Sequence, residues 1–524
     1  MRHSFAAAVA ATTLTCVAGC APATGAPRIP DPTALSTVTS SSPSVDGTRT
    51  ATGGSDVLYA SYLGGLGSDG GQVLLRPGGL LELAVITTDG ASIAPDVPHV
   101  RVGAGGGEDV AVVGLDASRK PAWVITIGGT GDDEVWSSAT DGTGATYLAG
   151  FTTSKDLPTT PRAAQRHFGG GSSDAFLVKV PPSGRQVAYV TYLGGTGSEE
   201  ARESVGVDTA GNAYVSGNTA SRNFPVTRGA FQTKWAGGDG TLDPSGMNKD
   251  AFLTKLSPDG SRFVFSTFIG GHGDEGVRGP ALDTHGNLYL AGATTSSDFP
   301  VTAHALQSKN AGGFADGWAM KLTSGGKRIW STYLGSADFD TLHGIATGRS
   351  GDPYVVGMTC GSFPTTAKAF QKERGGECDD LVAHLRASDG RPVYASFLGG
   401  PGNETDDQKV AVSPDGRALV VTTRVMTPDF PVTLNALKTG GDPLGDLTLS
   451  VISADGSHLD YSTYLGGTGE EDNWGARPVA APDGTVYVSG VTWASDLPTT
   501  ADAAQPTAPG GDGDGFVYQI SPPK

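Results

Sequence analysis

The segment Tyr461–Glu471, YSTYLGGTGEE, joins an apolar aromatic run to a Gly-Gly pair and a terminal acid. Versions of this phrase begin at seven places in the chain, at residues 59, 123, 189, 265, 330, 394 and 461. Successive copies are 64 to 76 residues apart. A spacing this regular indicates repeat architecture, with one structural unit for each copy. The Gly-Gly pair is expected to let the backbone turn through conformations that a side chain would hinder.

Each unit carries three further marks in step with that phrase. They are a turn and strand such as GNAYVSG (211–217), a tripeptide such as DFP (298–300), and a strand opened by aspartate such as DAFLTKL (250–256). Every unit thus holds four short β-branched or aromatic runs bounded by Gly, Asp and Pro. Seven such units predict an all-β fold, a seven-bladed β-propeller with four antiparallel strands per blade. A linear solenoid is the alternative, although its repeat is usually shorter and its ends need caps.

The two ends of the repeat region complement each other. An orphan strand, DVLYASYLGG (56–65), precedes the first unit, and the last unit stops at DGFVYQISPPK (514–524) without its outer strand. We therefore expect the N-terminal strand to pair with the last blade and close the ring. The whole propeller is predicted to be one domain that spans residues 55–524.

The four marks recur in register over about residues 55–521, and in this the chain resembles the bacterial seven-bladed β-propeller repeat family (SBBP repeats). The resemblance implies a propeller fold and an envelope or surface context, and it supplies no catalytic residues. The first unit departs most from the pattern, because DVPHVRVGAGGGEDVAVVGL (96–115) lacks the usual aromatic residues.

The N-terminus is expected to be a targeting segment. Residues 1–19 combine a short basic start with an apolar run too short to span a bilayer, as in a signal peptide. The residues VAGC (17–20) resemble a bacterial lipobox, which implies cleavage before Cys20, lipidation of its thiol and an extracytoplasmic protein anchored to a membrane of the cell envelope. An ordinary secretion signal is the alternative. Residues 20–54 are rich in Pro, Ser and Thr, as in a flexible tether.

Composition limits the class of partner. The formal net charge is −18, so the protein has little to neutralise phosphates with, and nucleic acid is not expected as a partner. Cations, basic partners and neutral glycans remain. Beyond Cys20 the chain has two cysteines, Cys360 and Cys378. An oxidising envelope permits a disulfide between them, but their spacing alone does not decide whether it forms.

Loop lengths predict which face of the propeller carries a site. Short turns such as PDGR (414–417) and PDGS (258–261) fall together on one face. The Gly-Gly loops and the Pro-containing loops are longer and fall on the other. Binding sites concentrate on long loops that a rigid scaffold holds in place, so we expect the site on the long-loop face.

Two sets of carboxylates recur in all seven units. One ends the Gly-Gly phrase: Asp69, Asp133, Glu199, Glu275, Asp340, Glu404 and Glu471. The other opens the third strand: Asp109, Asp174, Asp250, Asp316, Asp380, Asp446 and Asp514. Carboxylates grouped in this way are ligands that Ca²⁺ accepts. However, a residue that every blade uses identically is expected to brace the scaffold by accepting backbone N–H bonds, so no cofactor is expected and Ca²⁺ is the alternative.

Unlike residues at one repeat position are better candidates for function. The third position after the acid holds Gln72, Trp136, Arg202, Arg278, His343, Asp407 and Trp474. By register these residues lie near the mouth of the central channel, where Trp and Arg can stack on and hydrogen-bond a glycan or peptide. The alternative is that they cap the channel or pack between blades. A second candidate is Trp235, which opens an insertion in the third unit (235–249).

No nucleophile elbow G-x-S-x-G and no metalloprotease motif H-E-x-x-H occur in the sequence. The expected function is therefore an envelope-anchored binding module for a glycan or a protein, assumed to be monomeric. One alternative is a glycan-active enzyme in which His343, with Asp407 or Glu404, performs acid–base chemistry. Another is a structural surface component without a soluble ligand.

Overall fold

The computed structural model describes residues 56–523, apart from 64–70, 78, 89–93, 95, 203–204, 238–248, 403, 405–406, 474–475 and 511–512. The expected signal segment, Cys20 and the tether lie outside the described residues, as do Asp69 and Trp474. Within the described part, all regular structure is β-strand, and no helix has the length and apolarity that crossing a membrane requires.

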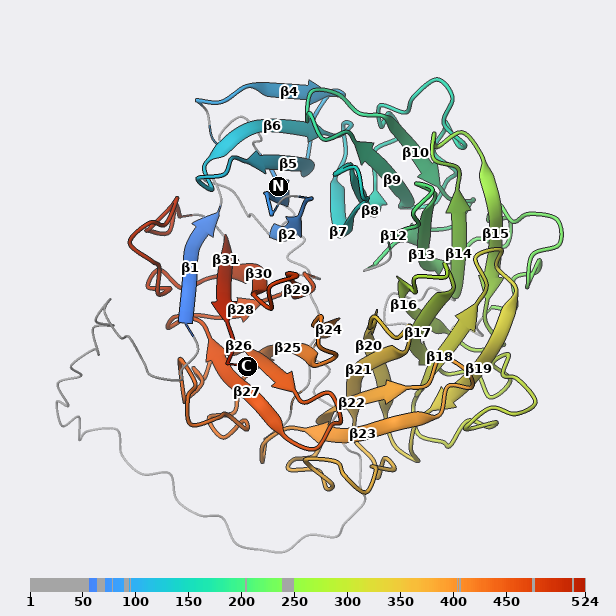
Figure 1. Ribbon diagram of the computed structural model, residues 1–524. Coiled ribbons are helices and arrows are strands. Elements are labelled where there is room, and N and C mark those ends of the chain that lie inside the picture. The colour runs from blue at the N-terminus through green and yellow to red at the C-terminus, as the bar shows by residue number, and fades with distance from the viewer. Residues whose placement is uncertain are drawn as a thin grey trace, which may run out of the picture. The chain divides into compact units, whose positions relative to one another are not determined.

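The strands form seven sheets arranged around a central axis (Figure 1), which confirms the predicted seven-bladed propeller. Blade 1 contains β2 (Gly71–Leu75), β3 (Leu81–Thr87), β5 (Asp109–Leu115) and β6 (Pro121–Ile127). Blade 2 contains β7 (Asp133–Thr140), β8 (Thr146–Thr152), β9 (Asp174–Val180) and β10 (Tyr189–Leu193). Blade 3 contains β11 (Glu199–Glu200), β12 (Val205–Val207), β13 (Ala213–Thr219), β14 (Asp250–Leu256) and β15 (Phe263–Ile269).

The next three blades repeat the same antiparallel order. Blade 4 contains β16 (Glu275–Leu282), β17 (Leu288–Thr294), β18 (Asp316–Leu322) and β19 (Arg328–Leu334). Blade 5 contains β20 (Asp340–Thr347), β21 (Pro353–Thr359), β22 (Asp379–Leu385) and β23 (Pro392–Leu398). Blade 6 contains β24 (Gln408–Val412), β25 (Ala418–Val425), β26 (Asp446–Ile452) and β27 (Leu459–Leu465).

The seventh blade is built from both ends of the chain. Its inner strand is split into β28 (Glu471–Asp472) and β29 (Val479–Ala480), followed by β30 (Val486–Thr492) and β31 (Asp514–Ser521). The outer strand is β1 (Asp56–Leu63), which pairs antiparallel with β31 with Ala60 opposite Tyr518. The ring is thus closed by the N-terminal strand, as predicted.

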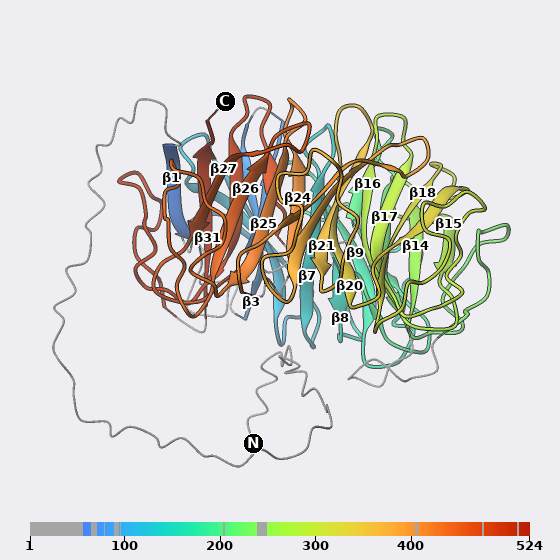
Figure 2. The same cartoon turned by 90° about the horizontal axis from the view of Figure 1, so that it is seen from below.

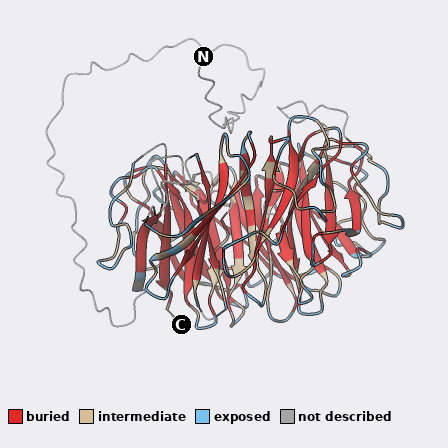
Figure 3. Ribbon diagram, turned by 90° about the horizontal axis from the view of Figure 1, so that it is seen from above, coloured by how far each residue is buried: buried red, intermediate tan, exposed pale blue. Residues whose placement is uncertain are grey.

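Burial on both faces explains why the strands are almost continuously apolar. All seven residues of β14, DAFLTKL, are buried, because each sheet packs against the blades on both sides. Figure 2 shows the sheets side by side, and Figure 3 shows the buried strands between two rims of exposed loops. One core cluster joins Leu177 of blade 2 to Phe252 of blade 3 across such an interface.

The tyrosine of the Tyr-Leu-Gly-Gly phrase forms hydrogen bonds with the Pro loop of the same blade. Tyr333 Oη accepts a hydrogen bond from the amide of Phe299 at 2.9 Å and donates one to the carbonyl of Ser296 at 2.8 Å. The outer strand of blade 4 thereby holds that blade's own Pro loop. Tyr192, Tyr464 and Tyr62 make the same pair of hydrogen bonds in blades 2, 6 and 7.

The Gly-Gly pair serves a purpose other than the expected one. Gly466 and Gly467 are not among the glycines with positive φ. Instead, a Cβ on Gly466 would lie 2.1 Å from Glu471 Oε2 and 2.2 Å from Asp446 Oδ1. The expectation of a special backbone conformation was therefore wrong here, because this glycine is needed to leave room for two converging carboxylates.

Blade 1 departs from the repeat where its sequence does. Its segment around His99 forms an additional strand, β4 (His99–Val102), which pairs in parallel with β6 along the outer edge of the sheet. The described part of blade 1 therefore has five strands instead of four.

Candidate functional site

In blades 2 to 7 a buried carboxylate follows the Gly-Gly loop (Gly-Ser in blade 5) and accepts hydrogen bonds that hold it in shape. Glu275 is 1% exposed and accepts hydrogen bonds from the amide of Gly271 at 3.2 Å and from Thr294 Oγ1 at 2.7 Å. The other described members are equally buried and accept the amide hydrogen of the residue four positions earlier: Asp133, Glu199, Asp340, Glu404 and Glu471. This is the geometry of a bracing group.

The carboxylates that open the third strand in blades 2 to 7 also accept hydrogen bonds from loop amides, as Asp316 does from Ala311 at 2.6 Å, whereas Asp109 of blade 1 pairs with Arg101. In blade 5 the assignment of this position to Asp380 was wrong by one residue. Strand β22 begins at Asp379, which pairs with Thr359 and accepts the amide hydrogens of the loop that precedes it. Consecutive aspartates made the sequence ambiguous, and Asp380 faces the opposite side of the sheet.

Burial sets the charge state of these groups. It raises the pKa of Glu275 to about 8, although the hydroxyls of Ser296 and Thr294 lower it in part. Burial likewise raises the pKa of Glu404 to about 7 and that of Asp174 to about 7. At pH 7 Glu275 therefore keeps its proton, and Glu404 and Asp174 are protonated in part, in contrast to the ionised carboxylates that a divalent cation requires.

The bracing role predicts that calcium has no effect on stability. Among the described residues, no three His, Cys, Asp or Glu side chains are grouped so as to hold a metal ion. We expect the same melting temperature at pH 7 with EDTA and with millimolar Ca²⁺, measured by circular dichroism. Magnesium at the same ionic strength serves as the control for general salt effects, and a rise specific to Ca²⁺ would contradict the bracing role.

The unlike residues at the third position after the acid do not form one ring of exposed side chains. Trp136 and Arg202 meet in one place, with the guanidinium carbon 4.3 Å from the centre of the indole ring. Trp136 Nε1 donates a hydrogen bond to Glu134 Oε2 at 2.9 Å, and Arg202 Nε donates one to Glu200 Oε2 at 3.1 Å. Arg202 covers one face of the indole, so this pair packs between blades 2 and 3.

Arg278, His343 and Asp407 come together on the other side of the channel, from blades 4, 5 and 6. Asp407 pairs with Lys409, and its Oδ1 lies 4.0 Å from His343 Nδ1. The side chain of Lys409 is fully buried, whereas those of His343 and Asp407 are 17% and 30% exposed. Burial opposes the charge of Asp407, but Lys409, His343 and Arg278 together hold its pKa well below the usual range. We call these four residues, with Gln408, the mouth cluster.

Gln408 fixes the tautomer of His343. Its Nε2 donates a hydrogen bond to Asp380 Oδ1 at 2.7 Å, so its Oε1 is the atom that faces His343 Nδ1, also at 2.7 Å. Because an amide oxygen only accepts, Nδ1 of His343 carries the proton and Nε2 carries the lone pair. Burial, together with the positive charges of Arg278 and Lys409, lowers the pKa of His343 to about 4. The negative charge of Asp407 opposes this shift. His343 is therefore neutral at pH 7.

The remaining candidates lie apart from the mouth cluster. Gln72 lines a different part of the channel, and Trp474 is outside the described residues. Trp235 lies at a shallow pocket beside Lys234, and the guanidinium carbon of Arg222 is 4.8 Å from the centre of its ring. These residues therefore do not extend the mouth cluster.

Cys360 and Cys378 form a disulfide, with their Cα atoms 4.0 Å apart. The first follows β21 and the second directly precedes β22. The bond therefore closes the long Pro loop of blade 5 at its base.

Two residues of the mouth cluster, Gln408 and Lys409, were not predicted from the sequence. They lie one and two positions after Asp407, which was singled out. Their residue types could have indicated a site, because the inner strands of the other blades mostly have small or apolar residues at these two positions. Their pairing across blades depends on packing that a repeat alignment does not contain.

The chain has distant similarities to solved structures. No curated protein sequence matches the chain significantly. Among solved structures, a protein of unknown function from Dyadobacter fermentans is 9% identical, covering 89% of this chain and 99% of its own, with a TM-score of 0.40. A europium-containing methanol dehydrogenase is 10% identical, covering 89% of this chain and 93% of its own, with a TM-score of 0.36. Similarities at this level carry no argument about function.

The sequence comparison identifies the repeat itself. Residues 188–225 run from the outer strand of blade 2, through the Gly-Gly loop and the inner strands β11 and β12, to the Pro loop of blade 3. This segment matches the SBBP β-propeller repeat family. The chain is therefore a seven-bladed β-propeller that carries an SBBP repeat.

Proposed function

We propose that the protein is a binding module that recognises a glycan of the cell envelope through the mouth cluster. The observation that carries this proposal is that unlike residues from three adjacent blades converge in one partly exposed group, while the rest of the scaffold repeats. Arg278 supplies donors, and Asp407 and the lone pair of His343 supply acceptors, while the buried Lys409 pairs with Asp407. Sugar hydroxyls both donate and accept, so such a mixture suits a polyhydroxylated ligand.

The proposed location rests on the N-terminal sequence. The VAGC segment, cleaved before Cys20, would leave a lipidated cysteine on a tether that ends where β1 begins. The disulfide between Cys360 and Cys378 is consistent with an oxidising, extracytoplasmic compartment. We therefore place the protein on an envelope membrane, held by its lipid.

A glycan array probed with the full-length, detergent-solubilised chain tests the proposal. We expect binding to a defined set of envelope glycans, and an affinity about tenfold lower for His343→Gln and for Asp407→Asn, because each removes hydrogen bonds or charge from the cluster. Asp455→Asn is the matched control, since this aspartate is half exposed on a tight turn outside the cluster.

Two results would overturn the proposal. One is the absence of any bound glycan, as expected for a purely structural component or for a protein-binding module. The other is unchanged affinity in both cluster variants, which would place the glycan elsewhere. Melting curves of all variants accompany the array, because Asp407→Asn leaves the buried Lys409 without its carboxylate.

A glycan-active enzyme is the second candidate, and one observation favours it. The hydrogen bond to Gln408 leaves the lone pair of His343 on Nε2, the position from which a histidine acts as a general base. Reducing-end and unsaturated-sugar assays on the array ligands test for hydrolysis and elimination. Turnover that disappears in His343→Gln and persists in Asp455→Asn would establish an enzyme, and turnover that persists in both would exclude His343 as its base.

A further inference from the structure

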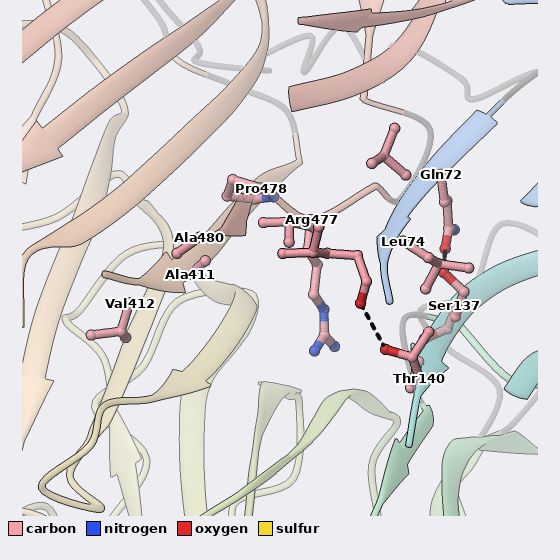
Figure 4. Close-up of a pocket in the computed structure, with 14 residues that line it drawn as sticks. Gln72, Leu74, Ser137, Thr140, Ala411, Val412, Arg477, Pro478 and Ala480 are labelled. Carbon is pink, nitrogen blue, oxygen red and sulfur yellow. Dashed lines mark hydrogen bonds between the residues drawn. The ribbon is translucent and has the colours of Figure 1, made fainter. Parts of the chain in front are cut away.

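The channel below the mouth cluster is poorly suited to further sugar units. Strand β24 leads from the mouth cluster into a cavity of about 300 Å³, and most of the residues that line this cavity are apolar. Gln72 Oε1 accepts a hydrogen bond from Ser138 Oγ at 2.6 Å. Thr140 Oγ1 donates one to the carbonyl of Leu75 at 3.1 Å (Figure 4). The long-loop face is therefore the side on which a glycan held by the mouth cluster can extend.

Two phenylalanines form an aromatic pair on that face, between blades 4 and 5. The ring centres of Phe314 and Phe339 lie 5.9 Å apart in an edge-to-face arrangement. Phe314 comes two residues before β18, and Phe339 directly precedes β20. The carbonyl of Phe339 accepts the amide hydrogen of Cys360, which follows β21 at the start of the Pro loop, at 2.9 Å. The pair therefore belongs to the rim of long loops.

A glycine brings the two loops of the pair into backbone contact. Gly313 has a φ of 71°, and a Cβ on it would lie 2.2 Å from the carbonyl oxygen of Asp338. The amide of Asp340 donates a hydrogen bond to the carbonyl of Ala315 at 2.9 Å. The loop before β18 is thus held directly against the loop before β20, and the scaffold fixes the place of both rings.

The aromatic pair occupies two repeat positions that the other units use differently. The position before the bracing carboxylate has a polar residue in the other six units: Ser68, Asp132, Ser198, Asp274, Asn403 and Glu470. The position of Phe314 has a glycine, a polar residue or, in the sixth unit, a leucine: Gly107, Ser172, Asn248, Glu377, Leu444 and Asp512. The propeller scaffold therefore does not require an aromatic ring at either position.

Much of the pair is open to solvent. Phe314 is 56% exposed, whereas Phe339 is half-buried and supports it from the side. An exposed aromatic ring releases water from its apolar surface when a partner covers it. Asp338 is exposed beside the pair, and its carboxylate can accept hydrogen bonds. We call Phe314, Phe339 and Asp338 the loop platform.

Strand β20 connects the loop platform to the mouth cluster. It begins directly after Phe339, and His343 is its fourth residue. At about 3.3 Å per residue, these two positions are roughly 13 Å apart along the strand. A single sugar ring is shorter than this distance. A ligand that contacts both the loop platform and the mouth cluster therefore has several linked units.

We propose that the loop platform binds a neutral sugar unit of the same glycan that the mouth cluster holds. This inference rests on the proposed function and makes its ligand specific, namely an oligosaccharide with a neutral unit at the platform. The C–H groups on one face of the sugar ring would stack on Phe314, and its hydroxyls would donate to Asp338. An acidic sugar would bring its carboxylate close to that of Asp338, and this repulsion selects against it.

An array of glucose, galactose, mannose and N-acetylglucosamine oligomers of one to six units tests the platform with the full-length, detergent-solubilised chain. Galacturonate oligomers are the acidic counterparts. We expect affinity for a neutral series to rise with length, and Phe314→Ala to weaken binding of the long oligomers about tenfold while leaving the short ones unchanged. Phe314→Tyr keeps the ring and should keep the affinity. Trp493→Ala is the matched control, since this residue is a 46% exposed aromatic of blade 7 outside the platform.

The variant His343→Gln distinguishes the platform from the mouth cluster, because it should weaken binding of oligomers of every length. If it does so while Phe314→Ala binds long oligomers normally, the platform is wrong and the proposed function stands. Binding to none of the oligomers would overturn both. Equal affinity for galacturonate oligomers would contradict the neutral unit, and a loss in Trp493→Ala alone would move the contact to blade 7. If Phe314→Ala does not fold, Phe314→Leu decides, because it keeps apolar bulk beside Phe339 without a ring.

Discussion

Raising the pH from 6 to 9 is expected to lower the free energy of unfolding by several kcal/mol. Burial raises the pKa of Glu275 to about 8 in the folded protein, whereas a free glutamate titrates near 4.5. The folded state therefore keeps a proton that the unfolded state loses, and the resulting stabilisation is complete below about pH 4.5 and disappears as the pH approaches 8. Between pH 6 and pH 8, Glu275 alone contributes a loss of about 2 kcal/mol. Glu404 and Asp174 act in the same direction.

Melting curves at constant ionic strength between pH 6 and pH 9 measure this effect. The matched variant is Glu275→Gln, which keeps the shape of the protonated side chain and cannot lose its proton. It should unfold with a clearly weaker pH dependence than the unsubstituted chain. A melting temperature that rises over this range, or an unchanged slope in the variant, would show that Glu275 is ionised in the folded protein.

The fold could be predicted from the sequence because each structural element of a blade recurs seven times in the chain. The phrase around Tyr461 predicted the number of blades, and the orphan strand at Asp56 predicted how the ring closes. Repetition also allowed the bracing role of Glu275 to be inferred before its hydrogen bonds were seen. Where two aspartates are consecutive, as at Asp379 and Asp380, the residue predicted to open the third strand was wrong by one position.

The candidate sites were harder to predict from the sequence, because they depend on contacts between blades that differ in sequence. The position that holds Trp136 and His343 was correctly singled out as variable, yet its members separate into a packed pair and a charged cluster. The same position also holds Gln72, which lies apart from both groups and accepts a hydrogen bond from Ser138.

The mouth cluster lies where the seven-fold repetition fails. Every unit of the sequence shares the carboxylate after the loop and the aspartate that opens the third strand, and changes there affect folding first. The mouth cluster instead uses unlike residues of blades 4, 5 and 6, so its contacts do not recur in the other described blades.

A chain that lacks β1 is expected to lose more stability than any single substitution causes. The strand buries Tyr59, Ala60, Tyr62 and Leu63, each 8% exposed or less, and fully burying one large apolar side chain contributes about 1.5–3 kcal/mol. Removing residues 1–63 therefore costs roughly 5 kcal/mol or more from burial alone. It also leaves the edge of β31 exposed, which promotes association between molecules. Melting curves and light scattering of the truncated chain measure both effects.

A synthetic peptide of residues 56–63 should restore much of this stability when added to the truncated chain. The peptide can pair with β31 along its whole length and return Tyr62 to the amide of Leu497. A peptide with Tyr62→Ala should rescue poorly, because it lacks both the ring and the two hydrogen bonds, and a scrambled peptide should not rescue at all. The truncated chain would contradict the argument if it melted like the full chain. Rescue by the scrambled peptide would contradict it as well, because only the native order of residues returns Tyr62 to the Pro loop of blade 7.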